Sequence, residues 1–234
     1  MSPAAAPHFR RAIRFYDASI GKKAVMAITG VILFAYVLGH LLGNLQIYAA
    51  DHDQINRYAA FLHDPARAGL LWAVRGLLFI SVVLHITVSI QLWSLNRAAR
   101  PIGYVKKDNV PSAYAARTMM WSGPIIAAFV IFHILHLTTG SVLPLEELGP
   151  NRPNVRANVI NGFQHPAVAA AYMVAMVLLC LHLYHGLWSM FQSVGLSHPR
   201  YTPGIKRVAA IAAILVAAGN ISIPLTVITG LLPD

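Results

Sequence analysis

The chain has 234 residues, of which 57% are hydrophobic and 11% are charged, and its mean hydropathy is +0.59. These values are typical of membrane proteins. The formal net charge of +10 does not indicate a nucleic-acid surface, because the basic residues flank apolar segments and form no continuous patch. The single cysteine, Cys180, excludes an internal disulfide and a cysteine-rich metal site. The segment before Lys22 contains no long apolar core, so we expect no cleavable signal peptide.

Five stretches are long and apolar enough to cross a bilayer, which takes about 20 residues in a helix. We therefore expect an all-α membrane protein that forms one domain with five transmembrane helices. The predicted spans are residues 24–48, 70–95, 118–142, 167–194 and 208–232.

The distribution of Lys and Arg predicts the orientation, because cytoplasmic loops carry an excess of both. Thirteen of the 18 basic residues fall in the N-terminal tail or in the loops after the second and fourth spans. The N-terminus is therefore expected on the cytoplasmic side of the cell inner membrane. The basic side is equally suited to dock a soluble partner. The two longest loops, 49–69 and 144–166, lie on the outer side, and we predict turns or a short surface helix in the second.

Six histidines lie within the predicted spans, and no Asp, Glu or Lys lies at the same depth. An ionisable side chain in hydrocarbon is costly and therefore indicates a function. Histidines that face inward from a helix bundle are suited to bind haem iron. For a single histidine the alternative is a hydrogen bond between helices. The six are His40, His85, His133, His136, His182 and His185.

Four of these histidines form two pairs when their depth is counted from the cytoplasmic ends of the helices. His40 and His133 lie at similar distances along the chain from the basic residues Lys23 and Arg117. His85 and His182 lie at similar but shorter distances from Arg97 and Gly195. With a rise of about 1.5 Å per residue, the first pair is expected roughly 6 Å further outward. The pattern predicts two stacked b haems, each ligated by two histidines, with no open axial position for oxygen chemistry.

Nearby residues refine this prediction. Gly30 and Gly123 each precede a histidine of the outer pair by ten residues. They are expected near the inner haem, where a side chain would obstruct the macrocycle, although close helix packing also explains them. His136 and His185 each follow a proposed ligand by three residues on nearly the same helix face. Either could be the true ligand instead, or could hydrogen-bond a propionate or water.

Three segments resemble the di-haem cytochrome b subunit of succinate:quinone oxidoreductases. They read AITGVILFAYVLGHLLGNLQ in the first span, GPIIAAFVIFHILH in the third and HLYHGLWSMFQSVG in the fourth. The most specific features are the two ten-residue glycine-to-histidine spacings and a histidine four residues before Gly-Leu-Trp-Ser. The resemblance covers essentially the whole chain. It implies that His40 and His133 ligate the distal haem iron, and His85 and His182 the proximal haem iron.

The resemblance also implies partners and a direction of electron flow. The family's complex carries a flavoprotein subunit with FAD and an iron–sulfur subunit, both docked on the cytoplasmic face. Electrons from succinate pass through FAD, iron–sulfur clusters and both haems to a quinone, mostly menaquinone in di-haem members. This chain alone is not expected to oxidise succinate. Some related fumarate reductases carry a proton-transferring glutamate two residues before the fourth-span ligand. Cys180 occupies that position here, which argues against the same proton path.

A quinone site needs an apolar cleft with one or two hydrogen-bond donors. Each candidate is also explained by capping, headgroup contact or interfacial anchoring. The outer candidates are Asn44, Gln46, His63 and Arg75, and the inner candidates, for a quinone or haem propionates, are Ser19, Lys23 and Trp93.

Two other functions are compatible with the sequence. A di-haem cytochrome b of a formate or hydrogen dehydrogenase would keep the haems but change the soluble partner. A non-redox membrane anchor or transporter would instead use the histidines to bind metal or relay protons.

Overall fold

The computed structural model describes residues 16–99 and 114–232. Within these ranges five helices are long and apolar enough to cross a membrane, which confirms the prediction of a multi-pass helical membrane protein. Which side of the membrane each end faces stays a prediction. Several basic residues behind that prediction lie outside the described residues, namely Arg10, Arg11, Arg14, Arg100, Lys106 and Lys107.

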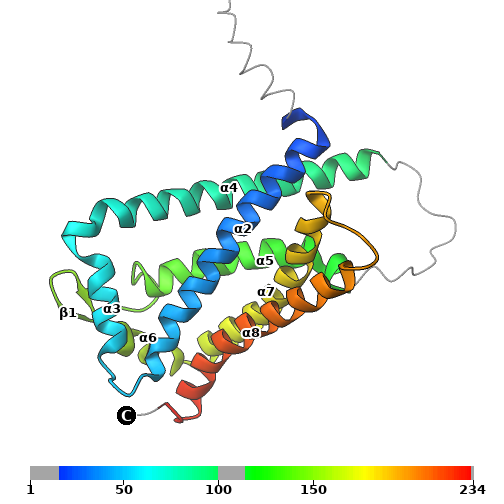
Figure 1. The fold of residues 1–234 in the computed structure, drawn as a ribbon. Coiled ribbons are helices and arrows are strands. Elements are labelled where there is room, and N and C mark those ends of the chain that lie inside the picture. The colour runs from blue at the N-terminus through cyan, green and yellow to red at the C-terminus, as the bar shows by residue number, and fades with distance from the viewer. Residues whose placement is uncertain (1–15, 100–113, 233–234) are drawn as a thin grey trace, which may run out of the picture.

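The five long helices form a bundle (Figure 1). Helix α2 packs against α4, α7 and α8, and α7 also packs against α5. Helices α2 and α7 therefore occupy the centre, where side chains from several helices meet. Many large apolar side chains on the outward faces are exposed, as expected for surfaces that contact lipid. The helices are α2 (Ser19–Asn44), α4 (Ala68–Ala98), α5 (Tyr114–Leu137), α7 (Pro166–Ser193) and α8 (Thr202–Ile228).

Most helix ends differ from the predicted spans by a few residues, and two of these differences have a clear local cause. Helix α5 ends at Leu137 and not at residue 142, because Gly140 adopts a left-handed φ of 68° and the Ser141 N–H donates to the Leu135 carbonyl. This arrangement is a glycine-dependent C-terminal cap. Helix α8 begins at Thr202, six residues before the predicted start, with a proline in its first turn. Proline is well tolerated there because the first N–H groups of a helix have no partner within it.

One end of the bundle carries a layer of short elements, called the cap layer here (Figure 1). For residues 144–166 the sequence predicted turns or a short helix, and the structure has both, as a two-stranded antiparallel hairpin and α6. Helix α3 was not predicted. The elements are η1 (Leu45–Tyr48), α3 (Gln54–His63), η2 (Pro65–Arg67), β1 (Glu147–Gly149), β2 (Arg152–Pro153) and α6 (Val155–Phe163).

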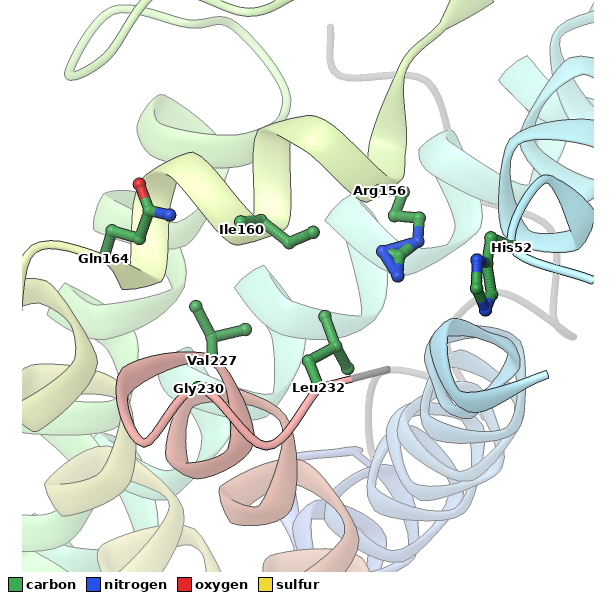
Figure 2. A pocket seen from close by; sticks show the side chains of 7 residues that line it. All are labelled: His52, Arg156, Ile160, Gln164, Val227, Gly230 and Leu232. Carbon is green, nitrogen blue, oxygen red and sulfur yellow. The ribbon is translucent and has the colours of Figure 1, made fainter. Parts of the chain in front are cut away.

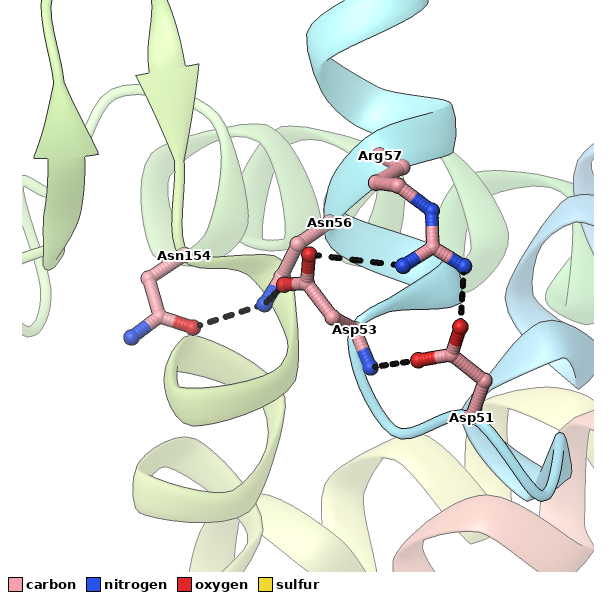
Figure 3. Close-up of polar contacts among 5 residues, drawn as sticks. All are labelled: Asp51, Asp53, Asn56, Arg57 and Asn154. Atoms are coloured by element: carbon pink, nitrogen blue, oxygen red, sulfur yellow. Dashed lines mark hydrogen bonds and ion pairs between the residues drawn. The ribbon is translucent and has the colours of Figure 1, made fainter.

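Buried Asn56 ties α3 to α6 (Figure 3). Its amide nitrogen donates to Asn154 Oδ1 at 3.3 Å and to Asp53 Oδ1 at 3.1 Å. Its oxygen accepts from the Arg156 backbone N–H at 3.0 Å. Each partner therefore satisfies a polar atom that burial would otherwise leave without a hydrogen bond.

The main buried apolar cluster lies where the cap layer meets α7 and α8. It fixes the cap layer against the helix ends, because it draws residues from both. Its members are Ile47, Ile55, Phe163, Ala169, Tyr172, Ile223 and Val227.

Candidate functional site

His85 on α4 and His182 on α7 face each other across the bundle. Their ring centroids are 6.3 Å apart and the ring planes are inclined by 53°. A metal ion bound by two imidazoles at about 2.0–2.1 Å each would hold the centroids roughly 6 Å apart. The observed separation therefore suits one ion between the two rings. We call these two residues the inner pair.

The inner pair has both polar and open surroundings. Thr29 Oγ1 lies 3.0 Å from His85 Nδ1, whereas the buried His182 Nδ1 has no partner among the described residues. A Cβ on Gly30 would meet His85 Cε1 at 3.6 Å, which places this glycine beside the ring. A Cβ on Gly186, one turn after His182, would meet no atom within 4 Å.

His40 on α2 and His133 on α5 form the second pair, called the outer pair. Their centroids are 5.7 Å apart and their planes are nearly perpendicular, at 85°. Tyr36 stacks on His40 at 5.4 Å, and Phe129 lies 6.0 Å from His133. Aromatic side chains thus contact both histidines of this pair.

The two pairs lie at different heights along the bundle. His85 is level with Thr29 and Gly30 of α2, and His40 lies ten residues beyond Gly30 on the same helix. At about 1.5 Å per residue, this separation is roughly 15 Å along α2. The order of the pairs agrees with the sequence prediction, but the separation is larger than the one predicted from the flanking residues. Those residues mark helix ends, and the helices differ in length, so they measure depth poorly.

His136 faces the cap layer and does not join the outer pair. Its Nδ1 lies 2.9 Å from the Tyr172 hydroxyl, and its ring is 1% exposed. A Cβ on Gly162 of α6 would lie only 2.6 Å from His136 Nε2, so α6 packs directly on this ring. The same Tyr172 hydroxyl lies 3.2 Å from His133 Nδ1.

His185 occupies the corresponding position beside the inner pair. Its ring packs edge-on against Trp188, with centroids 5.5 Å apart. His185 Nδ1 and Trp188 Nε1 are buried without partners among the described residues. Lys206 lies 4.5 Å above the Trp188 ring, at the basic end of the bundle.

Sequence patterns did not single out Thr29 or Tyr172. Each is a hydroxyl-bearing residue inside an apolar span, and that was the available signal. Their contacts with histidines depend on how neighbouring helices are rotated. Such rotation is not evident from the spacing of residues along one helix.

The predicted outer quinone residues are spread over several elements, and none of them lines either of the two cavities described below. Asn44 ends α2, and Gln46 lies in η1. His63 Nδ1 bonds with the Ala59 carbonyl at 2.9 Å, and the Arg75 guanidinium lies over Trp72.

The predicted inner residues lie on two helices, α2 and α4. Ser19 is the first residue of α2, and Lys23 is exposed. Trp93 stacks beneath Arg97 at 5.4 Å. A Cβ added at Gly123 on α5 would meet no atom within 4 Å, so nothing in the described residues fills the space beside this glycine.

A cavity of about 520 Å³ lies between α6 and the end of α8, at the cap layer (Figure 2). His52 and Arg156 lie at one end, and Gln164 at the end of α6 lies at the other. Ile160 and Val227 contribute apolar walls. Arg156 and Gln164 lie at the two ends of α6, whereas His52 comes from the loop before α3, so no sequence pattern groups all three.

A second, apolar groove of about 580 Å³ runs between α5 and α7. Phe129 and Phe132 line it together with small residues such as Ala171. Phe129 also contacts His133, so the groove adjoins the outer pair. Within the described residues no three His, Cys, Asp or Glu side chains converge on one point, so the histidines are grouped as pairs.

Fold and site together define a multi-pass helical membrane protein with two facing histidine pairs at two heights. Comparisons with protein-family models, characterised proteins and solved structures gave no match. A functional assignment therefore depends on the two pairs and their surroundings.

Proposed function

We propose that this chain is a membrane cytochrome b that binds two b haems and carries electrons between a soluble dehydrogenase and a quinone. His85 and His182 would ligate the inner haem iron, and His40 and His133 the outer one. The observation that carries the proposal is the presence of two facing imidazole pairs, each drawn from two helices of an apolar bundle. Ligation by two histidines fills both axial positions, which suits electron transfer.

Several features of the chain fit a haem at the inner pair. The centroid separation of 6.3 Å suits ligation of one iron by both rings. Gly30 and Gly186 keep bulk away from the two histidines. His185 and Trp188 carry buried nitrogens without described partners, and haem propionates are acceptors for such donors. Bound haem would supply one-electron transfer; the chain supplies the ligands, the donors and an apolar environment.

The dehydrogenase is proposed to be succinate dehydrogenase, with its iron–sulfur and flavoprotein subunits on the basic, cytoplasmic end. The exposed Lys23 and Arg97 lie at helix ends on this side, and the inner pair is the nearer of the two. Opposite charge on a partner would speed docking. Electrons would then enter at the inner pair and leave through the outer pair.

The quinone, expected to be menaquinone, is proposed to react near the cap layer. The cavity between α6 and α8 combines donors from His52, Arg156 and Gln164 with apolar walls. A quinone requires the same combination of donors for its carbonyls and apolar contacts for its ring and tail. The groove between α5 and α7 offers a lipid-facing surface for the tail.

The experiment is a reduction assay on the complex purified with its partner subunits. Pyridine haemochrome analysis is expected to give two b haems per chain. His85→Ala should abolish reduction of the outer haem by succinate, whereas a quinol should still reduce it. Finding one haem or none overturns the two-haem proposal. If succinate still reduces the outer haem at the normal rate in His85→Ala, the serial path is overturned. Copurification with a formate or hydrogen dehydrogenase overturns the assignment of succinate dehydrogenase as the partner.

A further inference from the structure

Each histidine pair contains one member whose Nδ1 contacts a hydroxyl group. Thr29 Oγ1 lies 3.0 Å from Nδ1 of His85, and Tyr172 Oη lies 3.2 Å from Nδ1 of His133. The opposite inner member, His182, has a buried Nδ1 without a partner among the described residues. His40 has Tyr36 stacked on its ring. The two pairs thus share an asymmetry, although different helices and residue types provide it.

The contacts of Thr29 determine which atom donates to which. Its Oγ1 lies 2.8 Å from the Val25 carbonyl and 3.1 Å from the Met26 carbonyl, and both oxygens can only accept. The single hydroxyl proton is therefore directed to the α2 backbone. Oγ1 then accepts from Nδ1–H of His85. Because a neutral imidazole carries one proton, Nε2 of His85 retains the lone pair that binds a metal.

Tyr172 makes the corresponding contact at the outer pair, and its hydroxyl also contacts a second histidine. Its hydroxyl also lies 2.9 Å from Nδ1 of His136. When His133 Nδ1–H donates to the Tyr172 oxygen, the phenol proton is available to His136 Nδ1. The result is a chain from His133 through Tyr172 to His136 that leaves Nε2 of His133 free as a ligand atom. Each hydrogen bond in such a chain polarises the next.

We propose that Thr29 and Tyr172 are positioning residues that fix the tautomer and ring orientation of His85 and His133. Each haem then has one axial histidine with a hydrogen-bonded Nδ1 and one without that bond. This inference rests on the proposed function. A hydrogen bond from the remote ring nitrogen raises ligand basicity, and loss of such a partner typically weakens metal binding about 10- to 100-fold. Greater basicity favours ferric iron, so loss of either hydroxyl should raise the midpoint potential of one haem.

Two pairs of variants test this in the purified complex. Thr29→Val has nearly the same shape without the hydroxyl, and Thr29→Ser retains it as the matched control. Tyr172→Phe removes the phenol oxygen. Tyr36→Phe is its control, because Tyr36 stacks on the other outer histidine. The readouts are haem content, a redox titration of each haem, and the low-temperature electron paramagnetic resonance signal, which reports the relative orientation of the axial rings.

Thr29→Val is expected to raise the potential or lower the occupancy of the inner haem alone, with Thr29→Ser close to wild type. Tyr172→Phe should act on the outer haem alone. If Thr29→Val does not accumulate, Thr29→Ala is used in its place, because it removes the same acceptor oxygen. Unchanged potentials and spectra with both haems present would overturn the positioning role and leave the cytochrome proposal intact. A wild-type chain without haem would overturn the cytochrome proposal itself.

Discussion

The inner and outer pairs each consist of two facing histidines from two helices, but their surroundings differ. Around the inner pair, Gly30 and Gly186 leave space, and Thr29 provides the nearest polar contact. The outer pair is enclosed by aromatic rings and lies below the cap layer, whose helix α6 reaches it through His136. The space around the inner pair therefore depends on glycine, without a side chain, at positions 30 and 186. The geometry of the outer site depends on packing between the bundle and the cap layer.

This difference predicts which substitutions affect one site and spare the other. Changes in α6 or the hairpin should reach the outer pair through packed rings, because well-packed interiors transmit small displacements. Among the described residues, the inner pair has no such connection to the cap layer. Its properties should therefore stay constant when the cap layer is altered.

The largest effect is expected from removing a proposed haem ligand. On α5 and α7, each proposed ligand has a second histidine three residues after it. His133→Ala and His182→Ala should each lose one b haem, because a bond to iron disappears. His136→Ala and His185→Ala should keep both haems and change only their potentials or assembly. Haem content per chain decides between the outcomes. Loss of the outer haem in His136→Ala, with retention in His133→Ala, would refute the assignment on α5.

A smaller effect is expected from Gly162→Ala on α6. The new Cβ would lie 2.6 Å from Nε2 and 2.7 Å from Cε1 of His136. That ring is bonded to Tyr172 and stacked on Phe132, so it cannot move away freely. Overpacking of this kind typically costs about 1–3 kcal/mol. We expect a lower thermal midpoint and an altered outer-haem spectrum, with the inner-haem spectrum unchanged.

The matched control is Gly76→Ala on α4, where the added Cβ would meet no atom within 4 Å. It should leave both spectra as in wild type and should not lower the thermal midpoint, because alanine is favoured over glycine inside a helix. Equal perturbation of both haems in Gly162→Ala would contradict the view that only the outer pair is coupled to the cap layer.

Asn158→Ala tests the cap layer itself. The buried Asn158 side chain accepts from Glu146 N–H at 2.7 Å and donates to the Glu146 carbonyl at 3.1 Å. Leaving buried backbone groups without partners costs about 1–3 kcal/mol. The hairpin after α5 should become more susceptible to protease, while both haems are retained. Asn161→Ala, which removes only an exposed bond to Glu146 Oε1, is the control. Equal cleavage in both variants would contradict the expected role of Asn158.

The long helices were predictable because the length of an apolar run is a local property of the sequence. Helix α3 was missed, although Ile55 and Ala59 lie four residues apart and both become buried. The segment is short and polar on average, and its burial comes from contacts with α6 and the hairpin. Tertiary contacts of this kind are not evident from a single segment.

The histidine pairs were predictable for a related reason. Helical rise converts sequence position into depth, so His40 could be matched with His133 before any helix packing was known. The vertical separation was underestimated, since it depends on how α2 lies against α4. The contacts of Tyr172 with His133 and His136 could not be predicted, because they depend on the rotation of α7 toward α5.

The smallest effect concerns pH at the edge of the cap layer, far from both pairs. Asp51 accepts from the Arg57 guanidinium and, at 3.1 Å, from the Asp53 backbone N–H (Figure 3). These bonds, with Arg57 contributing most, hold the pKa of the Asp51 carboxyl below its ordinary value. Because the folded-state pKa of Asp51 is depressed, its contribution to folded-state stability is fully present above the ordinary Asp pKa of about 4. It is lost only as pH falls through the lowered value.

We therefore expect the start of α3 to be insensitive to pH between about 5 and 8 and to loosen below about 4. Titration of the Asp51 carboxyl by NMR measures the pKa directly, and amide exchange at residues 54–57 reports the loosening.

In Arg57→Gln the pKa of Asp51 should rise toward its ordinary value, because the largest contribution to the shift is removed. An unchanged pKa in that variant would show that groups other than Arg57, such as the backbone N–H of Asp53, set it. The effect should remain small in either case, since both side chains are about half exposed and water screens their attraction. Neither haem spectrum should respond, because the loop that holds Asp51 precedes α3 and makes no described contact with either histidine pair.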